Sequence, residues 1–387
     1  MTSLVECLAA DWAAATLIGR MDLPEGPTPV RVRSGRVQDI SGFAPTCADA
    51  LARADDLATF EGRDLGALAD MEFVTVWDAP SPGAIKLLSP VDLQCVKASG
   101  VTFAVSAVER VIEERARGDA AAADDIRKAL KDKVGADLSA VKPGSEQAAA
   151  LKTALVADGL WSQYLEVAIG PDAEIFTKAP ILSSVGWGDF VGVRSDSAWN
   201  NPEPEVAVVC DSTGRILGAT LGNDVNLRDI EGRSALLLGK AKDNNASAAL
   251  GPFIRLFDDA FTLDDLRQAT ISLEVVGDDG FVMKGESSMS LISRDPVELV
   301  GQTVGKHHQY PDGFVLYLGT MFAPIDDRDA PGGGFTHKPG DRVRVSSPRL
   351  GVLDNKVTTC DQAPPWTLGV SGLMRNLASR GLLGGAR

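Results

Sequence analysis

The segment from Asn201 to Pro252 constrains the fold more than any other part of the chain, because it combines carboxylates with apolar runs. Glu203 and Glu205 are two residues apart and lead into an apolar run, residues 206–210, whose composition is typical of a strand. Side chains two apart along a strand leave the same face of a sheet. We therefore expect both carboxylates on one face.

A turn signal at residues 211–215 separates this run from a second apolar run over residues 216–225. We expect a hairpin with a two-residue loop at residues 213–214. In that register Asp224 lies opposite Glu203. Cross-strand neighbours have Cβ atoms about 5 Å apart, so their carboxylates can share one ion.

The sequence thus predicts that Glu203, Glu205 and Asp224 hold a metal ion. Oxygen ligands of this kind suit Mg²⁺, and also Mn²⁺. The alternative is a solvated strand edge, which needs no cation. Asp224 favours the metal site, because a charge inside an apolar strand is costly unless a cation or a hydrogen-bond network matches it. Lys242 follows just before a run of small residues.

The composition is ordinary for a soluble globular protein, with 387 residues, 44% of them apolar and 24% charged. A formal net charge of -15 argues against nucleic acid and anionic membranes as partners, because phosphate binding needs clustered Lys and Arg. The five cysteines are scattered without C-x-x-C spacing, which fits a reducing cytoplasm. No leader-like start and no uncharged apolar run of membrane-spanning length appear, so we expect a cytoplasmic protein without a membrane segment.

Three regions follow from the pattern along the chain. Residues 1–90 alternate strand-like segments with a helix-like stretch from Cys47 to Ala58, which predicts a small α/β region. Residues 91–170 are largely helical in composition and are expected to pack on the later domain. Strand signals dominate residues 171–387. The expected fold class is therefore α+β.

Two helical stretches are expected in the middle region. The first covers residues 101–133 and includes a second run at residues 121–130 after Gly118. The other covers residues 146–167, where Gly159 is the expected break.

Further polar residues lie near strand ends. Glu174 stands 29 residues before Glu203, and a glycine-bearing loop between them lets it approach the ion without ligating it. The alternative is an exposed acid at a strand edge. Thr320 ends a buried strand and could bond a ligand carboxylate, although buried threonines more often bond backbone. We expect the three histidines, His307, His308 and His337, to be structural or surface residues.

The order of these residues resembles the catalytic domain of the fumarylacetoacetate hydrolase superfamily. The motifs that carry the resemblance are Glu203-x-Glu205, Gly222-Asn223-Asp224-Val225-x-x-Arg228-Asp229, Lys242 before Gly251-Pro252, Leu318-Gly319-Thr320, Gly340-Asp341-x-Val343 and Leu350-Gly351-x-Leu353-x-Asn355-x-Val357. Within the superfamily, three segments resemble the branch of sugar-acid dehydratases. They are Gly100-Val101-Thr102-Phe103 with Ser106, residues 174–178 and residues 199–205. Over its full length the chain is most similar to the 2-keto-3-deoxy-D-xylonate dehydratase family.

The resemblance implies a mixed β-roll that holds Mg²⁺ through Glu203, Glu205 and Asp224, preceded by a smaller N-terminal α/β region. Two departures from the family pattern stand out. Hydrolase members carry a histidine where this chain has Ser106, which argues against hydrolysis of a carbon–carbon bond. Many relatives have aspartate at the position of Asn245, with a consequence that the sequence does not reveal.

The activity implied by the resemblance is dehydration of a 2-keto-3-deoxypentonate to 2,5-dioxopentanoate (α-ketoglutarate semialdehyde) in oxidative pentose catabolism. Lys242 is the expected base at C3 and Glu174 the expected acid at C4, although the residues alone leave the reverse assignment open. Ser106 and Thr320 are expected to bind the substrate carboxylate. The expected partner is a small sugar acid, and relatives imply a homodimer or homotetramer.

Two alternatives remain. One is a hydrolase or decarboxylase that acts on an acylpyruvate-type diketo acid at the same metal site. The other is a sugar-acid-binding protein without turnover. The sequence does not fix the stereochemistry of the substrate at C4.

Overall fold

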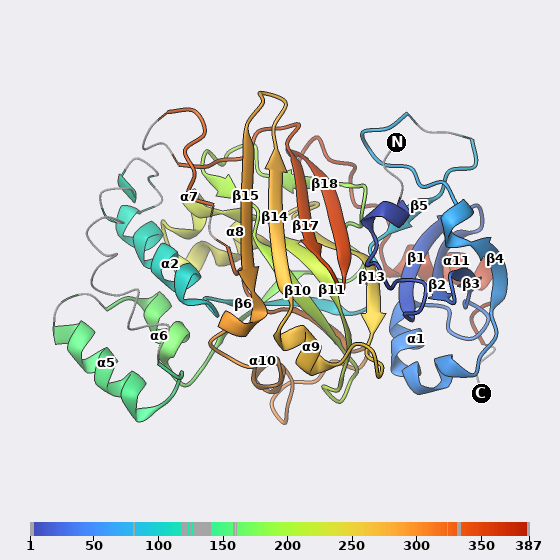
Figure 1. The fold of residues 1–387 in the computed structure, drawn as a ribbon, viewed down its shortest axis with the longest axis horizontal. Coiled ribbons are helices and arrows are strands. Elements are labelled where there is room, and N and C mark those ends of the chain that lie inside the picture. The colour runs from blue at the N-terminus through green and yellow to red at the C-terminus, as the bar shows by residue number, and fades with distance from the viewer. Residues whose placement is uncertain are drawn as a thin grey trace.

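The protein is described by a computed structural model that covers residues 4–79, 82–117, 119, 122, 123, 126, 141–157, 159, 161–322, 324–330 and 334–384. Its centre consists of two stacked β-sheets, with helices beside them (Figure 1). The architecture is α+β, as the sequence predicts.

The larger sheet has eleven strands and joins the N-terminal region to the strands that bear the carboxylates. In spatial order its strands are β4 (Arg63–Ala67), β3 (Arg36–Asp39), β2 (Gly26–Arg33), β1 (Leu17–Leu23), β13 (Ala248–Leu256), β11 (Ile216–Asp224), β10 (Pro204–Cys210), β16 (Phe314–Tyr317), β6 (Cys95–Gly100) and β7 (Glu174–Ala179), while β5 (Lys86–Leu88) pairs with β1. Its pairs are antiparallel except β16 with β6.

The smaller sheet has five strands and lies in front of β10, β11 and β13 in Figure 1. Its order is β15 (Val282–Ser288), β14 (Thr270–Val276), β17 (Arg342–Ser347), β18 (Gly351–Thr359) and β8 (Phe190–Val193). A two-stranded ribbon of β9 (Asn200–Asn201) and β12 (Asn226–Leu227) follows the carboxylate strands.

The helices gather at the sides and lower end of the sheets (Figure 1). The α-helices are α1 (Cys47–Ala52), α2 (Ala104–Ala116), α5 (Glu146–Ala157), α6 (Gln163–Ile169), α7 (Arg228–Glu231), α8 (Leu238–Lys242), α9 (Leu263–Arg267), α10 (Pro296–Thr303) and α11 (Val370–Ser379). Single 3₁₀ turns are η1 (Leu4–Cys7), η2 (Ala54–Ala58), η3 (Leu68–Asp70), η4 (Ala235–Leu237) and η5 (Met289–Leu291).

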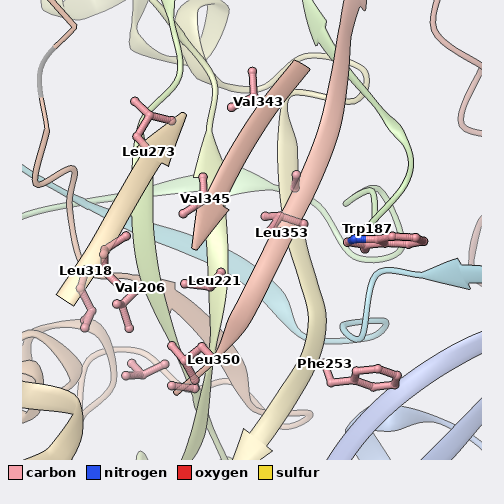
Figure 2. Close-up of a cluster of buried hydrophobic side chains, with 14 of the residues drawn as sticks. Trp187, Val206, Leu221, Phe253, Leu273, Leu318, Val343, Val345, Leu350 and Leu353 are labelled. Atoms are coloured by element: carbon pink, nitrogen blue, oxygen red, sulfur yellow. The ribbon is translucent and has the colours of Figure 1, made fainter. Parts of the chain in front are cut away.

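The main hydrophobic core fills the space between the two sheets. Figure 2 shows Val206 and Leu221 of the larger sheet with Leu273, Val345 and Leu353 of the smaller one. A second core covers the other face of the larger sheet and includes alternate residues of the same strands. The central strands are thus buried on both faces, which explains their continuous apolar runs.

This alternation decides where the carboxylates lie. Val206 and Val208 of β10 point into the core between the sheets, whereas Ala207 and Val209 belong to the core on the opposite face. Because side chains two apart share a face, Glu205 points away from the smaller sheet. Glu205 therefore lies on the face of the larger sheet opposite the smaller sheet.

The hairpin register expected from the sequence is confirmed. Pro204 pairs with Asn223, and the backbone N–H of Asp224 donates to the carbonyl of Glu203 at 3.0 Å. The expected two-residue loop is wrong, because the ladder shifts by one residue near its tip and Cys210 pairs with Ile216.

The reason for this shift is the side chain of Asp211. Its Oδ1 accepts hydrogen bonds from the backbone N–H groups of Thr213 and Arg215, at 2.9 and 3.1 Å. An aspartate that bonds nearby backbone in this way stabilises a longer turn. The loop therefore covers residues 211–215 without changing the register at the carboxylates.

Most other expected elements are present. The stretch from Cys47 to Ala58 forms α1 and η2, and the stretch from residue 146 to residue 167 forms α5 and most of α6, with Gly159 in the break. Most of the run expected at residues 121–130 lies outside the described residues. Among the described helices, none combines the length and the apolar character that crossing a bilayer requires.

Packing between the sheets should dominate the stability. Leu353 is 1% exposed in the main core, so Leu353→Ala should lower the free energy of unfolding by about 2–5 kcal/mol. Leu236 is 96% exposed, so Leu236→Ala should change it by less than about 0.5 kcal/mol. Urea titration monitored by circular dichroism measures both. Similar losses in the two variants would contradict this description of the core.

Candidate active site

Three carboxylates converge beside the end of the central hairpin. Glu203 immediately precedes β10, Glu205 lies on β10, and Asp224 ends β11. One oxygen of each can be chosen so that all three lie within 4.8 Å of one another. Their residues are 3%, 1% and 1% exposed, so water does not screen their repulsion. Such a cluster needs positive charge nearby.

Two lysines supply part of that charge. Lys242, the last residue of α8, donates from Nζ to Glu203 and, at 3.2 Å, to Asp224. Lys178 of β7 contacts the other oxygen of Asp224 at 2.7 Å. Burial opposes the ionisation of Asp224, but the two lysines outweigh it and hold the pKa of Asp224 below its usual value.

Lys178 and Lys242 differ in their surroundings. The Nζ of Lys178 also donates to the backbone carbonyls of Val225 and Lys242, at 3.0 and 2.7 Å. With Asp224, the ammonium group therefore has three partners. Lys242 instead lines the cavity in front of the carboxylates. Burial opposes its charge, but Asp224 and Glu203 prevail and raise the pKa of Lys242.

Glu205 has a different environment from its two neighbours. In the part of the chain that the structure describes, no Lys or Arg forms an ion pair with it, and its Oε2 accepts a hydrogen bond from the backbone N–H of Gly319 at 2.7 Å. Burial, followed by the charges of Asp224 and Glu203, raises the pKa of Glu205 well above its usual value. A buried carboxylate without a counter-ion, beside two others, is a donor set that fits a divalent cation.

Arg110 of α2 brings a third cation to the centre. Its guanidinium contacts Glu203, the Oε2 of Glu113 at 2.5 Å and the Oε2 of Glu231 at 3.0 Å. Glu113 also contacts the Nε of Arg228 at 3.1 Å. These residues link α2 and α7 to the carboxylate strands through one buried network.

Glu174 begins β7 and lies opposite Gly100 of β6. A Cβ atom at Gly100 would lie 1.9 Å from the Oε2 of Glu174, so the glycine leaves the space that the carboxylate occupies. Burial, followed by the negative charge of Glu231, raises the pKa of Glu174 to about 7. A carboxylic acid with this pKa can exchange a proton near neutral pH.

The two expected carboxylate-binding hydroxyls both lie in this region but bond backbone. Ser106 donates to the carbonyl of Phe103 at 2.8 Å, within the first turn of α2. Thr320 donates to the carbonyl of Phe322 at 3.0 Å. Each hydroxyl oxygen can still accept a hydrogen bond. Arg110 is a positively charged side chain of the same lining.

All seven side chains singled out from the sequence line one cavity, whose volume of about 10 Å³ leaves room for little more than a water molecule. The cavity residues expected from the sequence are Ser106, Glu174, Glu203, Glu205, Asp224, Lys242 and Thr320. The structure adds Arg110 and Glu231 to the lining, and Glu113 behind them.

The sequence contains a signal for part of the network that was missed. Ser106, Arg110 and Glu113 stand at positions i, i+4 and i+7 of α2 and form a polar stripe between the buried residues Ala107, Val111 and Ile112. Residues at these spacings share one face of a helix, so this face is predicted to make polar contacts beside the apolar residues. Glu231 offers no comparable signal.

The part of the chain that carries the three carboxylates is similar to known proteins. Residues 195–358 match the family model described as fumarylacetoacetate (FAA) hydrolase C-terminal. A probable 2-keto-3-deoxyxylonate dehydratase of Haloferax volcanii is 32% identical over 196 residues, which are 51% of this chain and 64% of that protein. A 2-dehydro-3-deoxy-D-arabinonate dehydratase of Saccharolobus solfataricus is 34% identical over 183 residues, which are 46% of this chain and 57% of that protein. The chain thus matches less than two thirds of the length of these relatives.

Solved structures share the fold over most of the chain. A 2-keto-3-deoxy-D-arabinonate dehydratase complexed with magnesium and 2,5-dioxopentanoate has a TM-score of 0.62 and 24% identity, and the match covers 89% of this chain and 99% of that one. Its apo form gives the same TM-score at 22% identity. The expected fold is therefore shared with these solved structures over most of the chain, and the match to the family model is confined to residues 195–358.

Proposed function

We propose that the protein is a Mg²⁺-dependent hydro-lyase that converts 2-keto-3-deoxy-D-xylonate to 2,5-dioxopentanoate. The observation that carries the proposal is the convergence of Glu203, Glu205 and Asp224 with Lys242 and Glu174 around one cavity. Two relatives named as 2-keto-3-deoxypentonate dehydratases and a solved relative with magnesium and 2,5-dioxopentanoate support it.

The different sugar names of these relatives denote one substrate. D-Xylonate and D-arabinonate differ only at C2 and C3, and these two centres become the ketone and the methylene of the 2-keto-3-deoxy acid. The remaining stereocentre, C4, is the same in both. We therefore propose the D-pentonate derivative as the substrate, in a cytoplasmic pathway of pentose oxidation.

Glu203, Glu205 and Asp224 would hold Mg²⁺, and they are equally suitable for Mn²⁺ because all their donor atoms are carboxylate oxygens. When bound, the cation supplies positive charge that balances these carboxylates and polarises the 2-keto group of the substrate. Among these three carboxylates, Glu205 forms no ion pair with a Lys or Arg of the described residues, so no side-chain cation competes with the metal for it.

Lys242 is the proposed base. It takes the C3 proton on Nζ, and the electrons of the C3–H bond move toward the polarised ketone. The amine must be neutral for this step. Its contacts with Glu203 and Asp224 favour the ammonium form, so the proposal requires that their negative charge be balanced by another cation.

Glu174 is the proposed acid. Breaking the C4–O bond requires a proton for the departing hydroxyl, which leaves as water and gives 5-hydroxy-2-oxopent-3-enoate with a C3=C4 double bond. Loss of a proton from C5 and gain of one at C3 then produce the C4=C5 enol, which tautomerises to the 2-keto aldehyde. A carboxyl group with a pKa of about 7 retains a proton for this purpose near neutral pH.

Arg110, with Ser106 and Thr320, lines the cavity where the anionic end of a sugar acid could be bound. We propose that Arg110 attracts the substrate carboxylate, and that Ser106 and Thr320 orient it once their hydroxyl groups turn from the carbonyls of Phe103 and Phe322, because a carboxylate only accepts hydrogen bonds. A homodimer or homotetramer is proposed from the family resemblance alone.

The decisive test of the activity is incubation of the purified protein with Mg²⁺ and each C4 epimer of 2-keto-3-deoxypentonate. Nuclear magnetic resonance should detect 2,5-dioxopentanoate from the D epimer. Formation of pyruvate from a diketo acid instead, or no product from either epimer, would contradict the proposal.

Glu205 should be essential for metal binding. Glu205→Gln replaces an anionic ligand with a neutral one and should lower the affinity for Mg²⁺ by at least about tenfold, the lower end of losses measured when metal-supporting residues are removed. Isothermal titration calorimetry measures the affinity directly. Glu286→Gln, which alters an exposed acid of β15, is the matched control and should bind Mg²⁺ like the wild type. Equal affinities in all three proteins would exclude Glu205 as a ligand.

Lys242→Met should retain Mg²⁺ binding but should not exchange the C3 proton of the substrate in deuterated water, because no amine is present to accept the proton. Lys240→Met, on an exposed position of the same helix, should exchange at the wild-type rate. Mass spectrometry of recovered substrate measures the exchange. Undiminished exchange in Lys242→Met would assign the base to another residue.

Glu174→Gln should separate the two half-reactions. The variant should still exchange the C3 proton, while dehydration falls by at least about 100-fold because the general acid is missing. In the wild type, kcat should fall as pH rises through about 7, because the carboxyl group loses its proton there. Asp172→Asn, which alters an exposed acid just before β7, should keep both the rate and this pH limb. Normal dehydration by Glu174→Gln would remove Glu174 from the mechanism.

A further inference from the structure

A second cavity lies at the junction between the N-terminal strands and the C-terminal segment. It is bounded by β1, by β5, by the chain that follows β7 and by residues 364–368. Its volume of about 380 Å³ is within the range of small-molecule sites. None of the proposed catalytic residues lines it.

Arg20 of β1 lines this cavity and lacks a partner among the described residues. The residue is only 5% exposed, and its Nε and Nη1 atoms are buried without a hydrogen-bond acceptor. Other buried arginines are bonded: Arg31 donates to the carbonyl of Phe60 at 2.6 Å, and Arg255 pairs with Asp11 at 2.7 Å. A buried guanidinium without an acceptor is costly, so Arg20 is the group that calls for an anionic ligand.

The remaining lining combines hydroxyl groups, an ion pair and apolar surface. Ser89 and Ser184 present hydroxyl groups that are 2.8 Å apart, and Lys86 pairs with Asp189 at 2.8 Å. The charge of Asp189 is thus matched by Lys86, and the other acid of the lining, Asp22, is exposed to solvent, so neither forms an ion pair with Arg20 in the described part of the chain. The half-exposed ring of Trp366 adds an apolar wall.

Asn245 places the C-terminal segment against this cavity. Its Nδ2 donates to the carbonyls of Cys360 and Pro364, at 3.1 and 3.2 Å. An aspartate at this position could not donate to either carbonyl. The departure from the family pattern at Asn245 thus has a structural role, and Asn245 itself lines the cavity.

We propose that this cavity binds a small oxyanion, a carboxylate or a phosphate, with Arg20 as its counter-ion. Arginine suits both groups because its planar guanidinium donates two parallel hydrogen bonds to a pair of oxygens. The site is separate from the cavity of the carboxylates and does not depend on the proposed dehydratase activity.

Calorimetric titration of the magnesium-saturated protein with phosphate and, separately, with succinate tests this site, at an ionic strength kept constant with chloride. Saturable binding of either anion is expected, and the anion that binds identifies the ligand class. Arg20→Met should weaken that binding by at least about tenfold, as the loss of a charge-assisted hydrogen bond implies. Equal binding by Arg20→Met and the wild type would place the anion elsewhere and overturn the proposal.

A second pair of variants keeps the test valid if Arg20→Met does not fold. Thr367 is an exposed residue of the lining, so Thr367→Asp adds a negative charge without disturbing the core. It should weaken anion binding, whereas the uncharged Thr367→Asn should not. No saturable binding by the wild type, or equal binding by these two variants, would also overturn the proposal.

Discussion

Mutual repulsion of buried carboxylates is the constraint on which the rest of this structure depends. Glu203, Glu205 and Asp224 lie side by side on one face of the central hairpin, where little water reaches them. Their charges must be balanced by other groups. Lys178, Lys242 and Arg110 surround two of the three, and each comes from a different element: β7, α8 and α2.

The two-sheet architecture makes this arrangement possible. The core between the sheets fixes β10 and β11 through alternate side chains, and most intervening side chains belong to the second core. Charged groups replace them toward the end of the hairpin, at Glu205 and Asp224. The strands β6 and β7 then bring Gly100 and Glu174 to the same region, and α2 covers it. The strands are thus held by apolar packing, whereas α2 and α7 are also tied to them by the buried ion pairs of Arg110.

The extent to which the sequence predicts this site depends on the kind of contact. The spacing of Glu203, Glu205 and Asp224 was enough to predict a register that the structure confirms, because strand periodicity and cross-strand pairing are local rules. The loop tip was predicted wrongly, since the side chain of Asp211 selects a longer turn. Partners such as Arg110 and Glu231 come from helices far away in the chain, so no local pattern links them to Glu203. The backbone bonds of Ser106 and Thr320 likewise depend on the geometry of the folded chain.

The central claim is that the three carboxylates bind one divalent cation. Anomalous diffraction from crystals grown with Mn²⁺ tests it most directly, because the metal is located independently of any activity. The account predicts a single strong anomalous peak between Glu203, Glu205 and Asp224. A peak elsewhere in the molecule, or none between these residues at a saturating Mn²⁺ concentration, would contradict it.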